Sequence, residues 1–527
     1  MPNSIEKQLA DLINRDQAHY LAQLQRGLEK ESLRVDPPGL LAQTPHPEKL
    51  GSALTHPSIT TDYSEALLEF VTPVHRDVDQ LLAQLYDIHH YTYRHLGDEK
   101  LWVNSMPCIV EGEQAIPIAR YGKSNIAKMK EAYRRGLGHR YGRLMQTIAG
   151  IHFNFSLPDD FWRARHGDGP DSTHLQSASY FGLIRNFHRL SWIGCYLFGA
   201  SPAVCKSFLA GRDHMLEDYD QYSFFAPNAT SLRLSGLGYS NNAQADIQIC
   251  YNSVQDFAQS LRSAIQTPNP KYQSYGLKVD GQYQQLNANL LQIENEFYSV
   301  IRPKRVTHSG ESPTHALNQR GVQYVEVRSL DLNPFEPTGI DKTCIHFFDL
   351  LLIYCLLDNS DQLSEEEWAI AADNRNKVVL DGRSPSLILN IKGKETPFAT
   401  AALEVLDQLA PIAQLLDQLS GKGEYQHALD AQVAKVQDAA LTPSAKIIAQ
   451  MSEDNASFFQ FAMKMAAQHE TAFKQRPMDE QKLELFRHQA KESHEKQLEI
   501  EQSDDVDFDT FLADYFKRQN QPWPEPK

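Results

Sequence analysis

Polar residues recur at spacings of two or four positions in four short segments of the chain. They are Glu29 with Glu31, Glu65 with Glu69, His152 with Asn154, and Tyr324 with Glu326 and Arg328. Because successive side chains of a strand point to opposite faces, the members of each set share one face if their segment forms a strand. A single set of this kind is the expected solvated side of an antiparallel sheet. Four sets that combine acids with a histidine or an arginine instead indicate a functional surface.

Carboxylates that converge on one surface repel one another, so cations are needed to neutralise them. Mg²⁺ takes oxygen ligands and leaves coordination positions open for phosphates. The acidic sets therefore predict two or three bound Mg²⁺ ions. An imidazole ligand such as His152 suits Mn²⁺ better than Mg²⁺, so Mn²⁺ stays an alternative.

Two runs of cationic residues accompany the acids. Residues 123–143 hold seven lysines and arginines interleaved with tyrosines, and most of this run is expected to be a solvated face. Arg302, Lys304 and Arg305 follow a segment of alternating polarity, and this position predicts phosphate contacts. The sequence has neither a Gly-x-x-x-x-Gly-Lys-Ser/Thr loop nor a Gly-x-Gly-x-x-Gly motif. If ATP is bound, we therefore expect metals and arginines on a sheet to hold it.

The elements that position these residues are predicted from periodicity. Alternating patterns bounded by turn residues predict strands at 26–35, 65–72, 147–158, 274–280, 288–300 and 321–330. Apolar residues at helical spacing predict helices at 5–25, 77–96, 176–199 and 345–357. From about residue 400 the pattern is helical to the end. The expected class is α+β, with a sheet-containing catalytic domain at 1–395 and a helical region packed on it at 396–527.

Length and composition limit the function classes. The chain has 527 residues and a formal net charge of −16, which argues against generic nucleic-acid binding. No apolar segment is long enough to span a bilayer, and the N-terminus lacks the apolar region of a secretory signal. Six scattered cysteines without Cys-x-x-Cys spacing favour reduced thiols. We expect a cytoplasmic, monomeric protein with no nucleic-acid partner and no membrane partner.

Several blocks of the sequence resemble the proteobacterial type of glutamate–cysteine ligase. The blocks are 26–34, 51–56, 59–65, 145–154, 230–234, 291–296, 301–305 and 324–331, among them Arg-Gly-Leu-Glu-Lys-Glu-Ser-Leu-Arg and Tyr-Val-Glu-Val-Arg-Ser-Leu-Asp. They stand in the family's order within residues 20–390. The resemblance implies a glutamine-synthetase-like fold, in which a curved and mainly antiparallel sheet forms a funnel with helices around it.

The reaction that the resemblance implies consumes ATP in two steps. The γ-carboxylate of L-glutamate attacks the γ-phosphorus of ATP and gives γ-glutamyl phosphate. The amine of L-cysteine then displaces phosphate, and the product is γ-glutamylcysteine, the first step of glutathione biosynthesis.

The resemblance also implies a role for individual residues. The positions that match metal ligands are Glu29, Glu31, Glu69, His152 and Glu326, with Asp62 a weaker match. Arg233 and Arg328 match residues that stabilise the transferring phosphoryl group and the acyl phosphate. Arg134, Gln146 and Asn154 match residues that hold glutamate, and Tyr63, Tyr133, Tyr239 and Tyr298 match the cysteine pocket. Arg302, Lys304 and Arg305 keep the phosphate role that their position predicts.

Three alternatives stay open beside this interpretation. In the first alternative, the protein is a ligase of the same fold that joins glutamate to an amine other than cysteine. Only the pocket for the acceptor amine distinguishes this activity from glutamate–cysteine ligation. A metal-dependent phosphotransferase stops after phosphate transfer. A non-catalytic relative is expected to have lost some of the metal carboxylates, and all of them are present here.

Overall fold

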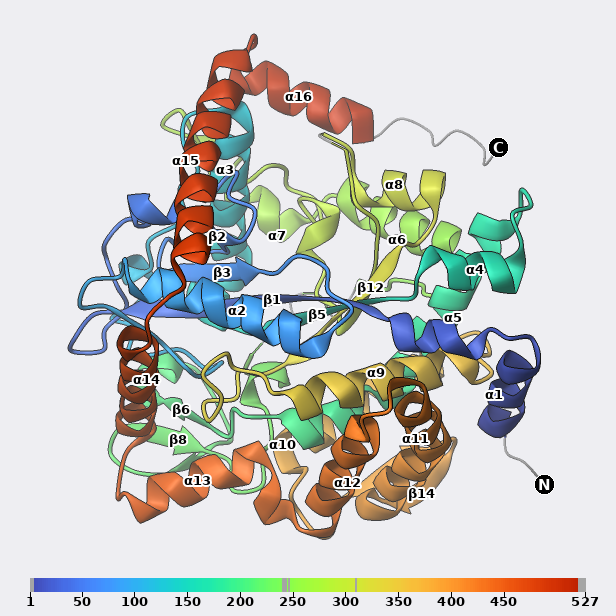
Figure 1. The fold of residues 1–527 in the computed structure, drawn as a ribbon. Coiled ribbons are helices and arrows are strands. Elements are labelled where there is room, and N and C mark those ends of the chain that lie inside the picture. Colours follow the sequence, from blue (N-terminus) through green and yellow to red (C-terminus); the bar gives the residue numbers. More distant parts are fainter. Residues whose placement is uncertain (1–3, 239–243, 245–246, 309, 520–527) are drawn as a thin grey trace.

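The computed structural model describes residues 4–238, 244, 247–308 and 310–519. At its centre lies an antiparallel sheet in the order β11-β12-β5-β1-β3-β2, with β4 beside the end of β1 (Figure 1). Its strands are β1 (Gln25–Val35), β2 (Ile59–Thr61), β3 (Leu67–Val71), β4 (Lys100–Leu101), β5 (Ile151–Ser156), β11 (Ile301–Lys304) and β12 (Tyr324–Leu330). The α+β class with a mainly antiparallel sheet is confirmed.

The register of the strands sorts their side chains onto two faces. Paired positions share a face, and the polar pairs are Glu31 with Glu69, Glu29 with His152, Asn154 with Glu326, and Glu326 with Arg302. The opposite face carries buried apolar residues of the same strands: Leu28, Phe70, Phe153, Phe155, Val325 and Val327. A shift of the register by one residue would place this apolar set in the solvent, so burial of the core fixes the polar face as well.

Helices enclose the sheet on both sides, with α3 and α6 to α8 on one side and α9 and α10 on the other (Figure 1). The helices are α1 (Ser4–Asn14), α2 (Val78–Tyr93), α3 (Asn125–Tyr141), α4 (Asp159–His166), α5 (Ser172–Phe198), α6 (Val254–Gln266), α7 (Pro270–Gln273), α8 (Pro313–Arg320), α9 (Lys342–Leu357), α10 (Glu365–Asp381), α11 (Phe398–Ser420), α12 (Glu424–Gln437), α13 (Pro443–Glu453), α14 (Phe458–Gln475), α15 (Glu480–Ser503) and α16 (Phe508–Gln519). Short strands outside the central sheet are β6 (Ala203–Cys205), β7 (Glu217–Asp218), β8 (Ser223–Phe225), β9 (Lys278–Val279), β10 (Gln282–Tyr283), β13 (Ile388–Ile391) and β14 (Lys394–Pro397).

The apolar face of the sheet packs on α5 and α9. Helix α9 is capped at its N-terminus by Asp341, whose side chain accepts a hydrogen bond from the Cys344 N–H, and most residues of the helix are buried. Its Phe348 ring lies 6.1 Å from the ring of Phe153 on β5, measured between centroids. None of the helices in the described ranges combines the length and the apolarity that a bilayer crossing requires.

Residues 288–300, predicted to be a strand, instead form a loop with one 3₁₀ turn. Arg140 of α3 donates hydrogen bonds to the carbonyl oxygens of Asn287 and Asn289 and pairs with Glu296 at 3.0 Å. The polar residues of this loop therefore contact helix α3. An alternating sequence pattern alone cannot distinguish such a loop from a strand with one polar face.

The other predicted elements differ mainly in length. The strands at 26–35, 65–72, 147–158 and 321–330 correspond to β1, β3, β5 and β12, and the helices at 77–96, 176–199 and 345–357 to α2, α5 and α9. The predicted helix at 5–25 is divided into α1 and a 3₁₀ helix at Ala18–Gln23. Of the predicted strand at 274–280, only β9 pairs with another strand.

Helices α11 to α16 form the C-terminal region, where the described residues after β14 contain no strand, as the helical pattern predicts. Helix α15 lies in front of α3 in the view of Figure 1. At its end, the Asp504 carboxylate accepts a hydrogen bond of 2.6 Å from the Asn125 N–H, the first residue of α3. The block 51–56 docks on the same helix, since the Ser52 N–H donates to Ser493 Oγ at 2.9 Å. The domain boundary at residue 395 stays a prediction.

Candidate active site

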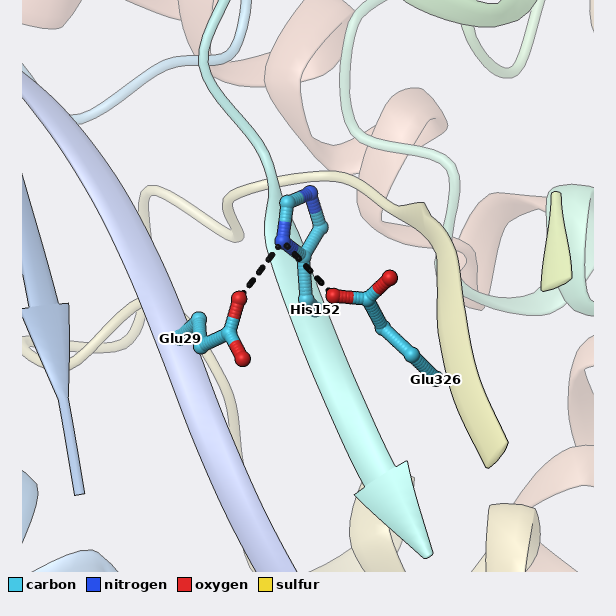
Figure 2. A group of neighbouring side chains, drawn as sticks. All are labelled: Glu29, His152 and Glu326. Atoms are coloured by element: carbon cyan, nitrogen blue, oxygen red, sulfur yellow. Dashed lines mark hydrogen bonds and ion pairs between the residues drawn. The ribbon is translucent and has the colours of Figure 1, made fainter. Parts of the chain in front are cut away.

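Glu29, His152 and Glu326 lie together on the polar face of the sheet (Figure 2). The Nδ1 atom of His152 lies 3.1 Å from Oε2 of Glu29 and 3.8 Å from Oε1 of Glu326. The three residues come from β1, β5 and β12, which the register places side by side. One ligand atom from each lies within 4.8 Å of the others, which is close enough for the two carboxylates to hold one divalent cation beside the imidazole.

A second group, Glu31, Glu69 and His152, adjoins the first and shares its histidine. Glu31 and Glu69 face each other across β1 and β3, and Oε1 of Glu31 lies 3.9 Å from Nε2 of His152. The Gly150 N–H donates a hydrogen bond of 2.7 Å to Oε2 of Glu31, which fixes this carboxylate. Two adjoining groups that could each hold a cation thus lie on four neighbouring strands.

The negative charges of Glu31 and Glu69, the carboxylates of the second group, are not fully balanced by nearby lysine or arginine side chains. Burial and the charge of Asp62 raise the pKa of Glu31 to about 8. Burial, together with the charges of Asp62, Glu29 and Glu31, raises the pKa of Glu69 well above its usual range. Each pKa unit corresponds to about 1.4 kcal/mol, so the ionised group is costly without a bound cation.

Glu326 is compensated by two cations. Lys304 Nζ lies 3.1 Å from its Oε1, and Arg328 Nη1 lies 3.2 Å from its Oε2. Burial alone would raise the pKa of Glu326, but these charges hold it well below the usual range. Glu326 is therefore ionised, and the phosphate-contacting cations predicted at 302–305 meet the acidic cluster at this residue.

His152 has the properties of a metal-binding histidine. Burial and the neighbouring Arg328 lower the pKa of His152, so the ring is neutral near pH 7. The contact of Nδ1 with Glu29 places the proton on Nδ1, which leaves Nε2 as the acceptor. Nε2 is buried and has no hydrogen-bond partner among the described residues. A free ring nitrogen that faces carboxylates, while the other nitrogen donates to an acid, fits a divalent cation.

Arg328 lies in this cluster, next to a β-bulge of β12. The register of β12 with β5 shifts by one residue between Val327 and Leu330, and such bulges re-aim a side chain next to a site. The Nη1 atom of Arg328 lies 3.5 Å from Nδ1 of His152. The structure thus places Arg328 beside both cation groups.

Arg233 lies against the same edge of the cluster, on a 3₁₀ turn (Leu232–Leu234). Its Nη2 donates a hydrogen bond of 3.0 Å to the carbonyl oxygen of Arg328. A Cβ at Gly150 would come within 2.0 Å of the same nitrogen, so only glycine leaves room for the guanidinium. The charge of Arg233 opposes the rise that burial causes in the pKa of Glu31. The two arginines predicted to be catalytic are therefore neighbours.

Asn154 and Gln146, two of the residues predicted to hold substrate, are both hydrogen-bonded within the site. Asn154 Nδ2 donates to Oε1 of Glu29 at 2.9 Å, and Gln146 Nε2 donates to the hydroxyl of Tyr298 at 2.9 Å. The Oδ1 atom of Asn154 is buried without a hydrogen-bond partner in the described part of the chain. Asn154 thus presents an acceptor beside the carboxylates.

Arg134 supports the segment that follows β2. Its Nε donates a hydrogen bond of 2.5 Å to the carbonyl oxygen of Asp62, and its guanidinium lies 4.6 Å from the centroid of the Tyr121 ring. The predicted glutamate-binding residue therefore holds the main chain of a predicted metal ligand. Glu65, whose spacing from Glu69 suggested a shared sheet face, lies before β3, and its carboxylate accepts hydrogen bonds from main-chain N–H groups instead.

The predicted cysteine pocket is described in part. Tyr63 is 1% exposed, and its hydroxyl, which lies beside Gly138 of α3, has no hydrogen-bond partner within the described ranges. Tyr133 is half-buried on α3, and the ring of Tyr298 packs against another tyrosine ring at a centroid distance of 5.7 Å. Tyr239 lies outside the described residues.

Arg302, Lys304 and Arg305 line a pocket of about 320 Å³ at the β11 edge of the sheet. Its apolar walls include Phe257 of α6 and Leu317 of α8. Apolar walls with a cationic rim suit a nucleotide, which carries an apolar base and anionic phosphates. The alternation of apolar and cationic residues at 301–304 is a sequence pattern from which strand β11 could have been predicted. No comparable pattern in the sequence indicates that α6 and α8 contribute walls to this pocket.

Acidic groups on a sheet face, two neighbouring arginines and a cation-rimmed pocket are typical of enzymes that transfer a phosphoryl group from a nucleotide with the help of divalent cations. The family model "Glutamate-cysteine ligase" matches residues 9–378. Since this match covers more than half of the sequence, the chain belongs to the glutamate–cysteine ligase family.

Individual relatives agree with this assignment. The glutamate–cysteine ligase of Alcanivorax borkumensis is 50% identical over 523 residues, which cover 97% of this chain and 99% of the relative. That of Pseudomonas putida KT2440 is 51% identical and covers 94% of this chain and 95% of its own length. The solved structure of a glutamate–cysteine ligase from Francisella tularensis, in complex with AMP, is 35% identical, with a TM-score of 0.89 and coverage of 94% of this chain and 98% of that one. The family, the ligase class and the fold expected from the resemblance are confirmed.

Proposed function

We propose that this ligase uses ATP to join the γ-carboxylate of L-glutamate to the amine of L-cysteine through γ-glutamyl phosphate, which gives γ-glutamylcysteine for glutathione biosynthesis. Family membership supports the substrates. The observation that carries the chemistry is the arrangement of two carboxylate groups around His152, next to Arg233 and Arg328, on one face of the sheet.

Divalent cations, Mg²⁺ or Mn²⁺, would be held by the two groups that meet at His152. Nε2 of His152 belongs with Glu31 and Glu69, since Nδ1 keeps its proton toward Glu29. Asp62 adds negative charge to this group. When bound, such cations neutralise phosphate charge and polarise the phosphoryl oxygens.

The arginines act on the phosphoryl group. Phosphoryl transfer needs alignment and charge neutralisation more than a dedicated base. The planar guanidinium fork of Arg328 matches phosphate oxygens, and its side chain is 11% exposed, so it can reach a ligand on the sheet face. Arg233, which is 1% exposed, lies behind it and adds positive charge from the buried side. In the second step the cysteine amine attacks the acyl carbon, loses a proton to the medium, and the carbon–oxygen bond to phosphate breaks. Arg328 and Arg233 stabilise the negative charge of the departing phosphate.

The pocket at β11 is the proposed nucleotide site. The relative from Francisella tularensis was solved with AMP, which supports a nucleotide site in this fold. Lys304 bridges from this pocket to Glu326, so phosphates bound along Arg302, Lys304 and Arg305 would point toward the carboxylate groups.

Arg305→Ala is expected to raise the KM for ATP about tenfold and to leave kcat within about threefold, because one charge-assisted phosphate contact is lost. Initial rates over a range of ATP concentrations measure both constants. Arg163→Ala, which removes an exposed arginine of α4 paired with Asp160, is the control and should change neither. An unchanged KM for ATP in Arg305→Ala would place the nucleotide elsewhere.

The acceptor amine is tested by the release of ADP. We expect release to require Mg²⁺ and glutamate together and to accelerate when cysteine is added, because the amine removes γ-glutamyl phosphate. Faster release with another amine, in a panel with glutamate fixed, would favour a γ-glutamyl ligase of different specificity. Equal release without any amine would favour the phosphotransferase alternative.

We also propose a cytoplasmic monomer. All six cysteines are free and five of them are buried, which supports a reducing compartment. Light scattering on the purified protein measures its oligomeric state.

A further inference from the structure

Asp331 directly follows β12 and has a fully buried side chain, with an exposure of 0%. Its Oδ2 accepts hydrogen bonds from the Ala200 N–H at 2.8 Å and from the Ser201 hydroxyl at 2.5 Å. Its Oδ1 accepts one from the Ser231 hydroxyl at 3.1 Å and lies 3.6 Å from Nη1 of Arg233. One carboxylate thus joins the end of a central strand to two separate loops.

The two loops also contact each other closely. The Leu232 N–H donates a hydrogen bond of 2.7 Å to the carbonyl oxygen of Ser201. A Cβ at Gly199 would lie 2.7 Å from the carbonyl oxygen of Thr230, so the backbones approach at a distance that only glycine permits. The 3₁₀ turn that carries the arginine is therefore docked on the loop after α5, and Asp331 attaches both to β12.

Arg233 is a buried guanidinium that needs a counter-charge at a defined place. A buried charge that loses its partner is strongly unfavourable, so the position of the anion determines where the cation rests. Asp331 lies on one side of the guanidinium, and the carbonyl oxygen of Arg328 accepts a hydrogen bond from Nη2 on another. The two contacts set the direction of the guanidinium relative to Glu31 and the sheet face.

We infer that Asp331 is a positioning residue of the ligase reaction. It holds Arg233 at the carboxylate groups and makes no contact with substrate itself. This inference rests on the catalytic role proposed above for Arg233.

Asp331→Asn tests the inference, because the amide keeps the shape of the side chain and removes the charge opposite Arg233. We expect kcat to fall about 10- to 100-fold, the scale of a small misplacement at a reacting centre, with the KM values for ATP, glutamate and cysteine within about threefold of wild type. A purely structural role would instead reduce the folded fraction and leave kcat per folded enzyme unchanged.

Asp349→Asn is the matched control. Asp349 of α9 is equally buried and pairs with Arg26 at 2.7 Å, outside the site. Its replacement should lower the Tm at least as much as Asp331→Asn does, without a change in kcat per folded enzyme. If Asp331→Asn retains wild-type kcat, the inference is wrong.

A double-mutant cycle separates the inference from the proposed function. If Asp331 acts through Arg233, adding Asp331→Asn to Arg233→Ala should change kcat by less than about twofold, because the group it positions is already gone. A full multiplicative loss would overturn the inference. Wild-type kcat in Arg233→Ala alone would instead overturn the catalytic role of Arg233. Arg233→Lys completes the same cycle if the alanine variant fails to fold.

Discussion

Arg328→Ala is expected to lower kcat about a hundredfold or more while the protein keeps its fold. Removal of one preorganised charge from a site where negative charge develops costs about 10²- to 10³-fold in kcat. Arg328 lies between Glu326 and His152 and is the only basic residue of β12, so no other side chain of that strand can replace its guanidinium. Steady-state ADP formation measures the loss, and circular dichroism confirms the fold.

Comparison of Arg328→Ala with Arg328→Lys shows whether the loss of kcat comes from a lost contact with the phosphoryl group. Arg328→Lys keeps the charge but not the planar fork, and should recover only part of the rate. Because Arg328 also helps to keep Glu326 ionised, each variant is assayed at saturating metal, which separates weaker cation binding from slower chemistry. A kcat within about threefold of wild type in Arg328→Ala would remove this residue from the reacting centre.

The acidic face of the sheet could be predicted from the sequence, because side chains two residues apart in a strand point to the same face. Glu29 with Glu31, and His152 with Asn154, are spaced by two within continuous strands, so their shared side follows from the backbone alone. Glu65 did not follow the rule, because the chain turns before β3 begins and its carboxylate binds main-chain N–H groups. A spacing of four residues carries information only when the strand runs through both positions.

The order of the strands in the sheet, and the buried contacts that hold the site residues in place, could not be predicted from the sequence. β1, β5 and β12 are separated by more than a hundred residues each, and their adjacency is set by packing of the apolar face on α5 and α9. The turn that carries Arg233 and the contacts of Asp331 belong to loops, where no period indicates which atoms meet. The resemblance supplied the two arginines predicted to be catalytic, Arg233 and Arg328, but it gave no reason for their geometry.

Glu69→Gln is expected to lower kcat about a hundredfold or more and, at the same time, to raise the Tm of the metal-free protein. Burial and the nearby acids raise the pKa of Glu69 well above its usual range, so the carboxylate destabilises the fold when no cation is bound. An amide of the same shape lacks this repulsion. The substitution also removes one proposed metal ligand of the Glu31–Glu69–His152 group, so activity and stability are expected to change in opposite directions.

The same repulsion predicts a pH dependence that can be assigned to Glu31. Its pKa is about 8 in the fold, against an ordinary value of 4.5. Between these values the folded, metal-free protein binds a proton that the unfolded chain has lost, so the contribution of Glu31 to stability decreases as the pH rises from 4.5 to about 8. Glu31→Gln should remove this decrease, and Mg²⁺ should counteract it by binding the ionised carboxylates.

Thermal unfolding with EDTA and with Mg²⁺ measures these effects. The wild type should gain Tm with increasing Mg²⁺, whereas Glu69→Gln should begin higher in EDTA and gain little. Glu99→Gln is the control, and it should change the Tm in the opposite direction to Glu69→Gln. Glu99 is a buried carboxylate that is already paired with Arg34 at 2.7 Å. Its replacement should lower the Tm and leave the gain with Mg²⁺ intact. If Glu69→Gln kept the wild-type gain, Glu69 would not be a ligand; if it lowered the Tm in EDTA, the carboxylates would not repel one another in the metal-free fold.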